Sequence, residues 1–241
     1  MVKKTIDHLY ISSWDQDYCS AAELEAILKD LKPSQILYPG YLPNREKANQ
    51  VDSMSLIDKY LGPPTPKKYK GNYIGWQAQS WGYSNFTYSH GLKFDNPNDN
   101  SVIHMWRTGN FNVLSLGDLE SSELVSKLTD NDFLKEVDVL ILPHHGSSKE
   151  FTTKELLEAL APRLCLALVD RNNQYGHPDP TVEQRAREHS RYISTKDGDI
   201  IIETTGSYNT NFKVYNYISS GNKLESIEGF ESKKYVKYYH S

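Results

Sequence analysis

The chain has 241 residues and a formal net charge of −4 at pH 7, with 31 acidic against 27 basic side chains. This charge excludes a global positive field, so a polyanionic substrate would have to be held locally by a metal ion or a few lysines. The two cysteines are too few for a disulfide framework, and because no long apolar stretch occurs, we expect a cytoplasmic protein without a membrane span.

The first part of the chain alternates short strands and amphipathic helices. Because no linker rich in Pro, Gly or Ser divides the sequence, we expect one domain over residues 1–241. Ser20 and Glu23 form a capping box, which predicts a helix that starts just after Ser20. The expected elements are a strand at 9–12, a polar turn at 13–18 that carries Asp15 and Asp17, the capped helix, a strand at 36–38 and a helix at 45–61.

Residues 63–100 have weak periodicity, and we interpret them as a variable insertion of loops with a few short strands. Three lysines lie here among aromatic residues, in a mixture that suits contacts with nucleic acid. A solvated insertion without a binding role explains the same composition. The residues concerned are Lys67, Lys68, Lys70, Tyr69, Tyr73, Trp76 and Trp81.

The remaining sequence alternates strands and helices and includes one hairpin, which predicts an α/β fold with a mixed sheet and helices outside it. Thr152 with Glu155 forms a second capping box, and Asp179 followed by Pro180 predicts another helix start. We expect strands at 102–106, 111–116, 137–142, 164–169, 199–204, 212–218 and 223–227, helices at 122–128 and 152–160 and after Asp179, and a mobile basic tail at 228–241.

Three polar loops follow strand-like runs, and strand ends are where α/β folds gather their chemistry. These loops contain Gly117-Asp118, His144-His145-Gly146 and Asn173 to His177. A mixed set of carboxylate and imidazole ligands suits zinc, manganese or iron, and a metal ion held in this way can activate water for hydrolysis. The pattern therefore predicts one hydrolase site built from three loops.

Each motif also has a structural explanation when it is taken alone. Gly117-Asp118 can be a turn or a helix cap, and one of the paired imidazoles can simply satisfy a backbone carbonyl. His177 can belong to a loop before a helix, while Asp15 and Asp17 can form a solvated turn. The order of the motifs, each at a strand end, favours a shared site.

These motifs resemble those of the C-terminal metallo-β-lactamase-fold domain of the ComEC family of bacterial DNA-uptake channels. The resemblance covers about residues 100–204 and implies an αββα sandwich, zinc or manganese, and hydrolysis of DNA or another phosphodiester. The matching pieces are Asn100-Ser101-Val102, Gly117-Asp118-Leu119-Glu120, Asp138-Val139-Leu140, Pro143-His144-His145-Gly146-Ser147-Ser148, Asn173-Gln174-Tyr175-Gly176-His177-Pro178 and Thr195-Lys196-Asp197-Gly198.

The sequence departs from the family pattern in two places. The first metal loop of the family reads HxDxDH or HxHxDH, whereas Ser13 and Tyr18 stand here at the outer histidine positions. A serine hydroxyl and a neutral tyrosine are poor substitutes for imidazole nitrogen. The N-terminal strands of the family also have no counterpart, so we expect a shortened sandwich with a sheet edge that a partner protein or a second copy covers.

Two hypotheses follow. In the first, the protein is a metal-dependent phosphodiesterase or nuclease. The ion is manganese or zinc, with magnesium as a further option, and its ligands are Asp15, Asp17, Asp118 and His145. His144 or His177 then contacts the phosphate or protonates the leaving oxygen, and Ser147 and Asn173 donate hydrogen bonds. In the second, a metal-free module binds nucleic acid or a partner protein. Hydrolysis of a lactone or thioester is a third option, and a role in an anti-phage assembly rests on analogy alone.

Overall fold

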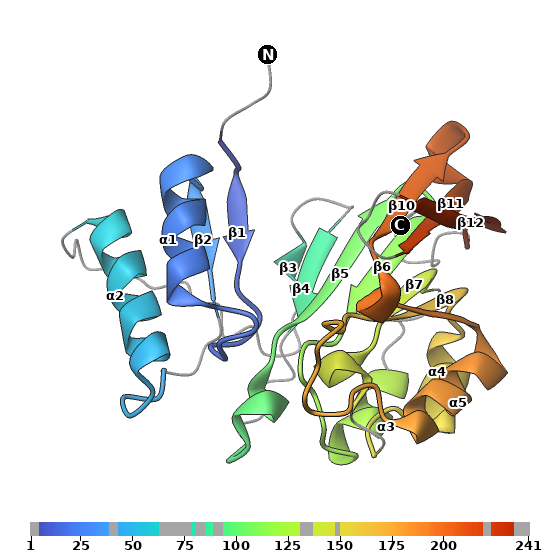
Figure 1. The fold of residues 1–241 in the computed structure, drawn as a ribbon, viewed down its shortest axis with the longest axis horizontal. Coiled ribbons are helices and arrows are strands. Elements are labelled where there is room, and N and C mark those ends of the chain that lie inside the picture. Colours follow the sequence, from blue (N-terminus) through green and yellow to red (C-terminus); the bar gives the residue numbers. More distant parts are fainter. Residues whose placement is uncertain are drawn as a thin grey trace. The chain divides into compact units, whose positions relative to one another are not determined.

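The computed structural model describes residues 5–38, 43–62, 79–80, 85–88, 94–130, 137–147, 150–218 and 223–233 (Figure 1). The chain forms two compact units. Unit 1 comprises Met1–Trp76 and Ser89–Val102, and unit 2 comprises Gln77–Tyr88 and Ile103–Ser241. The single domain expected over 1–241 stays a prediction, and the basic and aromatic patch of the insertion lies outside the described residues.

Unit 1 is built from two short parallel strands and two helices. Strand β1 (His8–Tyr10) pairs with β2 (Gln35–Leu37). The predicted helix start after Ser20 is confirmed, because the Ser20 hydroxyl accepts a hydrogen bond from the Glu23 backbone N–H at the start of α1 (Ala21–Asp30). The apolar faces of both helices and the strands form one core around the buried Trp14; its buried members are Ile11, Trp14, Cys19, Leu24, Leu28, Ile36 and Ile57.

The second helix of unit 1, α2 (Ala48–Leu61), starts three residues later than predicted. Asn44 accounts for the delay, because its side-chain oxygen accepts a hydrogen bond from the Glu46 backbone N–H at 2.9 Å and holds a turn there. Farther along, the 3₁₀ turn η1 (Pro97–Asn100) completes the described part of the unit. The Asn100 amide bonds both the backbone N–H and the carbonyl of Phe94, at 3.0 and 2.8 Å.

Unit 2 contains a seven-stranded mixed sheet in the order β3-β4-β5-β6-β7-β8-β9. The first four strands are antiparallel neighbours and the last four are parallel, which confirms the predicted mixed sheet and α/β class. The strands are β3 (Gln79–Ser80), β4 (Asn85–Tyr88), β5 (Ile103–Thr108), β6 (Phe111–Ser115), β7 (Val139–Ile141), β8 (Leu164–Ala167) and β9 (Arg191–Ser194).

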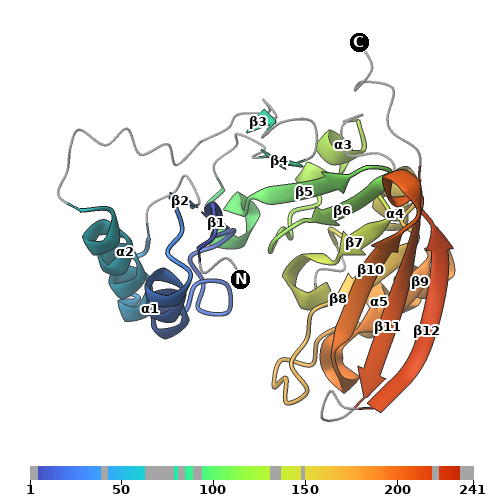
Figure 2. The same ribbon diagram turned by 90° about the horizontal axis from the view of Figure 1, so that it is seen from above.

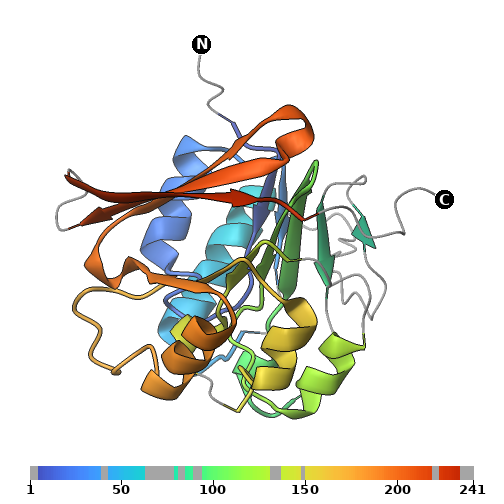
Figure 3. The same cartoon turned by 90° about the vertical axis from the view of Figure 1, so that its right-hand side faces the viewer.

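Two further layers cover this sheet. On one face lies an antiparallel sheet of β10 (Ile200–Thr205), β11 (Asn211–Ile218) and β12 (Lys223–Glu231), packed through Phe111 and Phe212, whose ring centroids are 5.0 Å apart. On the other face lie α3 (Glu123–Thr129), α4 (Lys154–Leu160) and α5 (Pro180–His189), as Figures 2 and 3 show. All four residues of β8 are buried, as expected for a strand covered on both faces.

Several predicted boundaries need correction. The cap of α4 is Thr153, whose hydroxyl accepts a hydrogen bond from the Leu156 backbone N–H at 3.2 Å, and not Thr152, which is fully buried. Strand β9 was not predicted from the sequence. Residues 228–231 belong to β12 and not to a tail, while residues 234–241 of the expected tail lie outside the described part.

The helices of the described residues are short or polar. Among these residues, no helix combines the length and the apolar character needed to cross a membrane.

Candidate functional site

The parallel strands of unit 2 bring their loops to one edge of the sheet, because the carboxyl ends of parallel strands point the same way. The 3₁₀ turn η3 (Pro143–Gly146) follows β7 and contacts the loop after β6, since the His144 backbone N–H donates to the Gly117 carbonyl at 2.9 Å. It also contacts the loop after β8, since the Asp179 N–H donates to the Gly146 carbonyl at 2.9 Å. The three loops singled out in the sequence therefore meet.

Three imidazole rings gather at this edge. His144, His145 and His177, here called the histidine cluster, have ring centroids 5.6 to 6.2 Å apart. The rings of His145 and His177 are nearly parallel, with an angle of 14° between their planes. Residues more than thirty positions apart in the sequence are thus held side by side by the loops after β7 and β8.

The two adjacent histidines are each oriented through Nδ1. The Nδ1 atom of His144 lies 2.5 Å from the Glu120 carboxylate oxygen Oε1, and Nδ1 of His145 lies 2.7 Å from the Leu168 carbonyl oxygen. A carbonyl can only accept, so Nδ1 of His145 carries the proton and Nε2 is the ring nitrogen suited to bind a metal or accept a proton. Ligating histidines commonly use this arrangement.

The backbone of η3 is strained at both histidines. His144 has φ 45° and His145 has φ 57°, which places two non-glycine residues in the left-handed region. Such conformations cost on the order of 1 kcal/mol or more each and concentrate at functional sites, where surrounding structure holds them. Here the contacts to Gly117, Glu120 and Leu168 hold the turn.

His177 is held by its own loop. Its carbonyl accepts a hydrogen bond from the Asn173 side-chain nitrogen at 2.6 Å, and the Tyr175 ring stacks on its imidazole at 5.9 Å. Burial lowers the pKa of His177, and the neighbouring His144 and His145 rings lower it further. His177 is therefore biased toward the neutral form, and the Asn173 amide shapes the loop.

The other predicted residues of unit 2 lie in the same loops. Asp118 is 2 % exposed and follows Gly117, which turns the chain at φ 59° two residues after the end of β6. Ser147 ends η3, with its backbone N–H donating to the His144 carbonyl at 2.9 Å. Their predicted contacts with an ion or a phosphate stay predictions.

In unit 1, the carboxylate of Asp15 is already engaged by three side chains. Its Oδ1 lies 3.0 Å from Lys47 Nζ and 3.2 Å from Gln50 Nε2, and its Oδ2 accepts from Ser13 Oγ at 3.3 Å. Asp17 is exposed. The Lys47 ammonium thus supplies the positive charge at Asp15, and the predicted placement of Asp15 and Asp17 beside the histidines stays a prediction.

The fit of these residues to a metal ion is mixed. Over the described ranges, no group of three or more His, Cys, Asp and Glu side chains is arranged to hold one. The orientation of His144 and His145 through Nδ1 fits a ligand role, whereas Asp15 with Lys47 bound to it does not. Manganese, zinc and magnesium accordingly stay predictions.

Two contacting residues were not assigned roles from the sequence. Glu120 was quoted only as part of a motif, although its position two residues after Asp118 in a convergent loop pointed to the same site. Lys47 lies 32 positions from Asp15, and no local pattern connects the two residues.

Comparison with known proteins identifies a distant relative. A search against models of known protein families finds no match. The chain is 27% identical over 199 residues to ComE operon protein 3 of Bacillus subtilis (strain 168), a match that covers 80% of this chain and 24% of that protein. The chain thus spans about a quarter of its relative's length, and over most of its own length it is similar to a segment of ComE operon protein 3.

Proposed function

We propose that the protein is a metal-dependent phosphodiesterase of the metallo-β-lactamase fold that acts on nucleic acid through the histidine cluster. The observation that carries this proposal is the anchoring of two adjacent imidazoles through Nδ1, beside the third imidazole of His177. This arrangement makes Nε2 of His145 the ring nitrogen suited to an ion and gives His144 a carboxylate partner, as in hydrolases that move protons through an oriented imidazole.

The layers of unit 2 support the fold assignment. Helices, a mixed sheet and a second sheet lie in the order α, β, β, which is the order of three successive layers in an αββα sandwich. The described residues of the motifs that resemble the ComEC family lie in strands, loops and 3₁₀ turns of this part, apart from Asn100-Ser101-Val102. Similarity to ComE operon protein 3 adds support from an independent comparison.

The proposed chemistry divides roles among the described residues. His145 and Asp118 would hold the ion, and Asp15 and Asp17 are the further ligands predicted from the sequence. A bound ion supplies an activated water and neutralises charge on the phosphate. Glu120 keeps the Nδ1–H of His144 in place, so that Nε2 of His144 exchanges a proton with the leaving oxygen.

Manganese titration with a fluorescent single-stranded oligonucleotide and a cyclic dinucleotide tests this function. Wild-type protein is expected to cleave at least one of them, and His145→Ala and Asp118→Asn to lose turnover by a factor of about 100 or more. His189→Ala, at the end of α5, is the matched control. No turnover with manganese, zinc or magnesium, or equal turnover in all variants, would refute the proposal.

A second candidate is a binding module without catalysis. The engagement of Asp15 by Lys47, together with Ser13 and Tyr18 at the expected histidine positions, favours it. In this case purified protein would contain no stoichiometric transition metal and would bind oligonucleotide equally well with and without a chelator. Elemental analysis discriminates the two candidates, because a stoichiometric ion that is lost in Asp118→Asn rejects the module. A partner protein or second copy within a larger assembly is compatible with both.

A further inference from the structure

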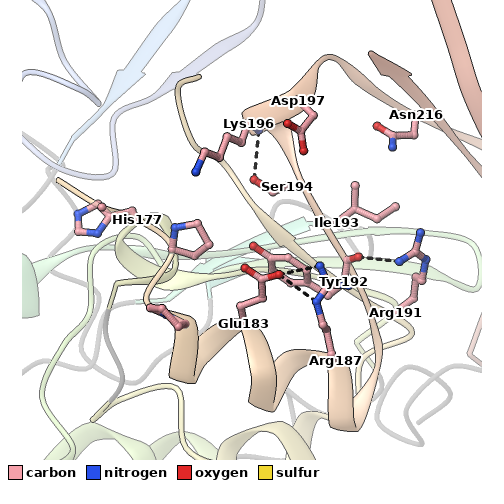
Figure 4. A pocket seen from close by; sticks show the side chains of 13 residues that line it. His177, Glu183, Arg187, Arg191, Tyr192, Ile193, Ser194, Lys196, Asp197 and Asn216 are labelled. Atoms are coloured by element: carbon pink, nitrogen blue, oxygen red, sulfur yellow. Dashed lines mark hydrogen bonds and ion pairs between the residues drawn. The ribbon is translucent and has the colours of Figure 1, made fainter. Parts of the chain in front are cut away.

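A cavity of about 450 Å³ opens beside the histidine cluster. It lies between α5, β9, the 3₁₀ turn η4 (Thr195–Asp197) and β11, with His177 on its rim (Figure 4). Its volume is within the range of about 300–1,000 Å³ that is usual for small-molecule sites. His177 therefore belongs both to the cluster and to the entrance of this cavity.

The positively charged side chains that line the cavity differ in whether they form an ion pair with a carboxylate. Arg187 pairs with Glu183 at 2.6 Å and lies over the Tyr192 ring, while Arg191 pairs with Glu228 at 2.7 Å. Lys196 makes no ion pair with any carboxylate of the described residues. Figure 4 shows its side chain extending toward the His177 side of the cavity. Lys196 is thus the lining cation suited to meet an incoming anion near the cluster.

The wall of the cavity formed by β9, η4 and β11 carries both hydrogen-bond donors and hydrogen-bond acceptors. The Asn216 Oδ1 atom is buried and has no hydrogen-bond partner among the described residues, whereas its Nδ2 donates to Glu225 at 2.9 Å. Ser194 and Asp197 add a hydroxyl and a carboxylate to the lining. A buried acceptor without a partner is unfavourable until a donor fills the site. This wall suits a neutral group with several N–H donors better than a second phosphate.

Gly198 fixes the wall on this side. A Cβ at this position would lie 1.8 Å from the Tyr217 carbonyl oxygen, so only glycine allows η4 to pack so closely on β11 next to Asn216. Lys196 and Asn216 are therefore held on two elements in direct backbone contact, and the cavity is formed before a ligand arrives.

We propose that this cavity binds one nucleotide unit of the substrate. The phosphate lies between Lys196 and His177, and the nucleobase enters the cavity toward Asn216 and Ser194. The proposal rests on the proposed function because it places the scissile phosphodiester at the rim, next to the histidine cluster. It adds the place where one nucleotide of the substrate is bound, and names Lys196 and Asn216 as the residues that recognise it.

Calorimetric titration of metal-free protein with a nucleoside 5′-monophosphate tests the site separately from catalysis. Wild type is expected to bind AMP or GMP more tightly than inorganic phosphate or the free nucleoside. Lys196→Ala is expected to weaken monophosphate binding about tenfold, since a charge-assisted hydrogen bond is lost. Lys196→Arg is expected to retain binding, and Lys213→Ala, an exposed lysine on β11, is the matched control. Asn216→Leu is expected to weaken binding of the monophosphates but not of phosphate.

The outcomes separate the two proposals. Absence of monophosphate binding to wild type, equal binding by Lys196→Ala and Lys213→Ala, or equal affinity for phosphate and monophosphates overturns the nucleotide site. Oligonucleotide hydrolysis with the KM unchanged in Lys196→Ala also overturns it and leaves the phosphodiesterase intact. Monophosphate binding that depends on Lys196, in a protein without hydrolytic activity, supports the site and rejects the phosphodiesterase.

Discussion

Glu120 is the side chain that orients the imidazole of His144. It is 33 % exposed at the side chain and lies 2.5 Å from His144 Nδ1, so its carboxylate can hold the ring and stabilise a positive charge on it. A carboxylate in this position acts through the histidine and is a positioning residue.

We predict that Glu120→Gln lowers kcat by about tenfold to hundredfold and leaves KM unchanged, because an amide holds the ring less firmly and offers no charge. Steady-state kinetics on the oligonucleotide measure both constants. Glu123→Gln, three residues along the chain on α3, serves as the control. A change confined to KM, or equal effects in both variants, would contradict the role.

Lys47 forms an ion pair with Asp15, the residue predicted from the sequence to bind a metal ion. The pair is 3.0 Å long with the lysine side chain 54% exposed, so it contributes little to stability. We predict that Lys47→Met tightens Mn²⁺ binding about tenfold, because the Asp15 carboxylate no longer needs to be released from an ammonium group. Calorimetry measures the affinity, with Lys29→Met on α1 as the control. Unchanged affinity would show that Asp15 is not a ligand.

At the scale of elements, Gly146 determines how closely the turn η3 approaches the loop of His177. It has φ 81°, and a Cβ there would lie 2.9 Å from the Pro178 Cβ. Gly176 has φ 73°, but a Cβ added there would meet no atom within 4 Å, so it shares the backbone conformation without the close contact.

We predict that Gly146→Ala lowers the free energy of unfolding by about 1–3 kcal/mol, and by more than Gly176→Ala, since only the first adds a steric clash to the backbone strain. Urea unfolding followed by circular dichroism measures both. Equal losses would mean that the contact between the two loops does not constrain the histidine cluster.

Local patterns explain which elements the sequence predicted well. Asp179 caps α5 as expected, with its carboxylate accepting from the Thr181 N–H at 2.7 Å, because a cap and its partner lie within one turn. The predicted cap of α4 was wrong by one residue, because Thr153 beside it is an equally good cap and packing placed Thr152 in the core. Strand β9 escaped prediction because four residues with a mixed burial pattern carry little periodicity.

In the candidate site too, the sequence predicted the short motifs but not the contacts between residues far apart in the chain. Sequence motifs placed His144, His145 and His177 at strand ends, and the parallel topology explains why they meet. The partners that orient them were harder to find, since the Leu168 carbonyl carries no side-chain signal and Glu120 is one of many acidic residues. Contacts across 23 or 24 positions depend on strand order, which local patterns do not encode.

At the scale of unit 2, Asp138 connects its two sheets. Its Oδ2 accepts from the Asn112 N–H on β6, and its Oδ1 accepts from the Lys233 N–H after β12, both at 2.8 Å. Burial raises the pKa of Asp138 to about 6 despite these hydrogen bonds, which act in the opposite direction. The folded state therefore favours the protonated carboxyl, relative to the unfolded value of 3.8.

Because the folded pKa is raised, the stabilising contribution of Asp138 is complete below about pH 4 and is lost as the pH rises through about 6. We predict that wild type gains about 2 kcal/mol relative to Asp138→Asn between pH 7 and pH 4. Urea unfolding of both proteins across this pH range measures the difference in their free energies of unfolding. The contributions of the other titrating groups cancel in this difference. A difference that shrinks on acidification would contradict the prediction.

We propose above that the histidine cluster binds a metal ion through ring nitrogen. Electron spin echo spectroscopy of the Mn²⁺-loaded protein tests it most directly, because imidazole nitrogen on the metal modulates the echo. We predict ¹⁴N modulation in wild type that is diminished in His145→Ala and unchanged in His189→Ala. Bound Mn²⁺ without nitrogen modulation, or the same modulation in His145→Ala, would contradict the account.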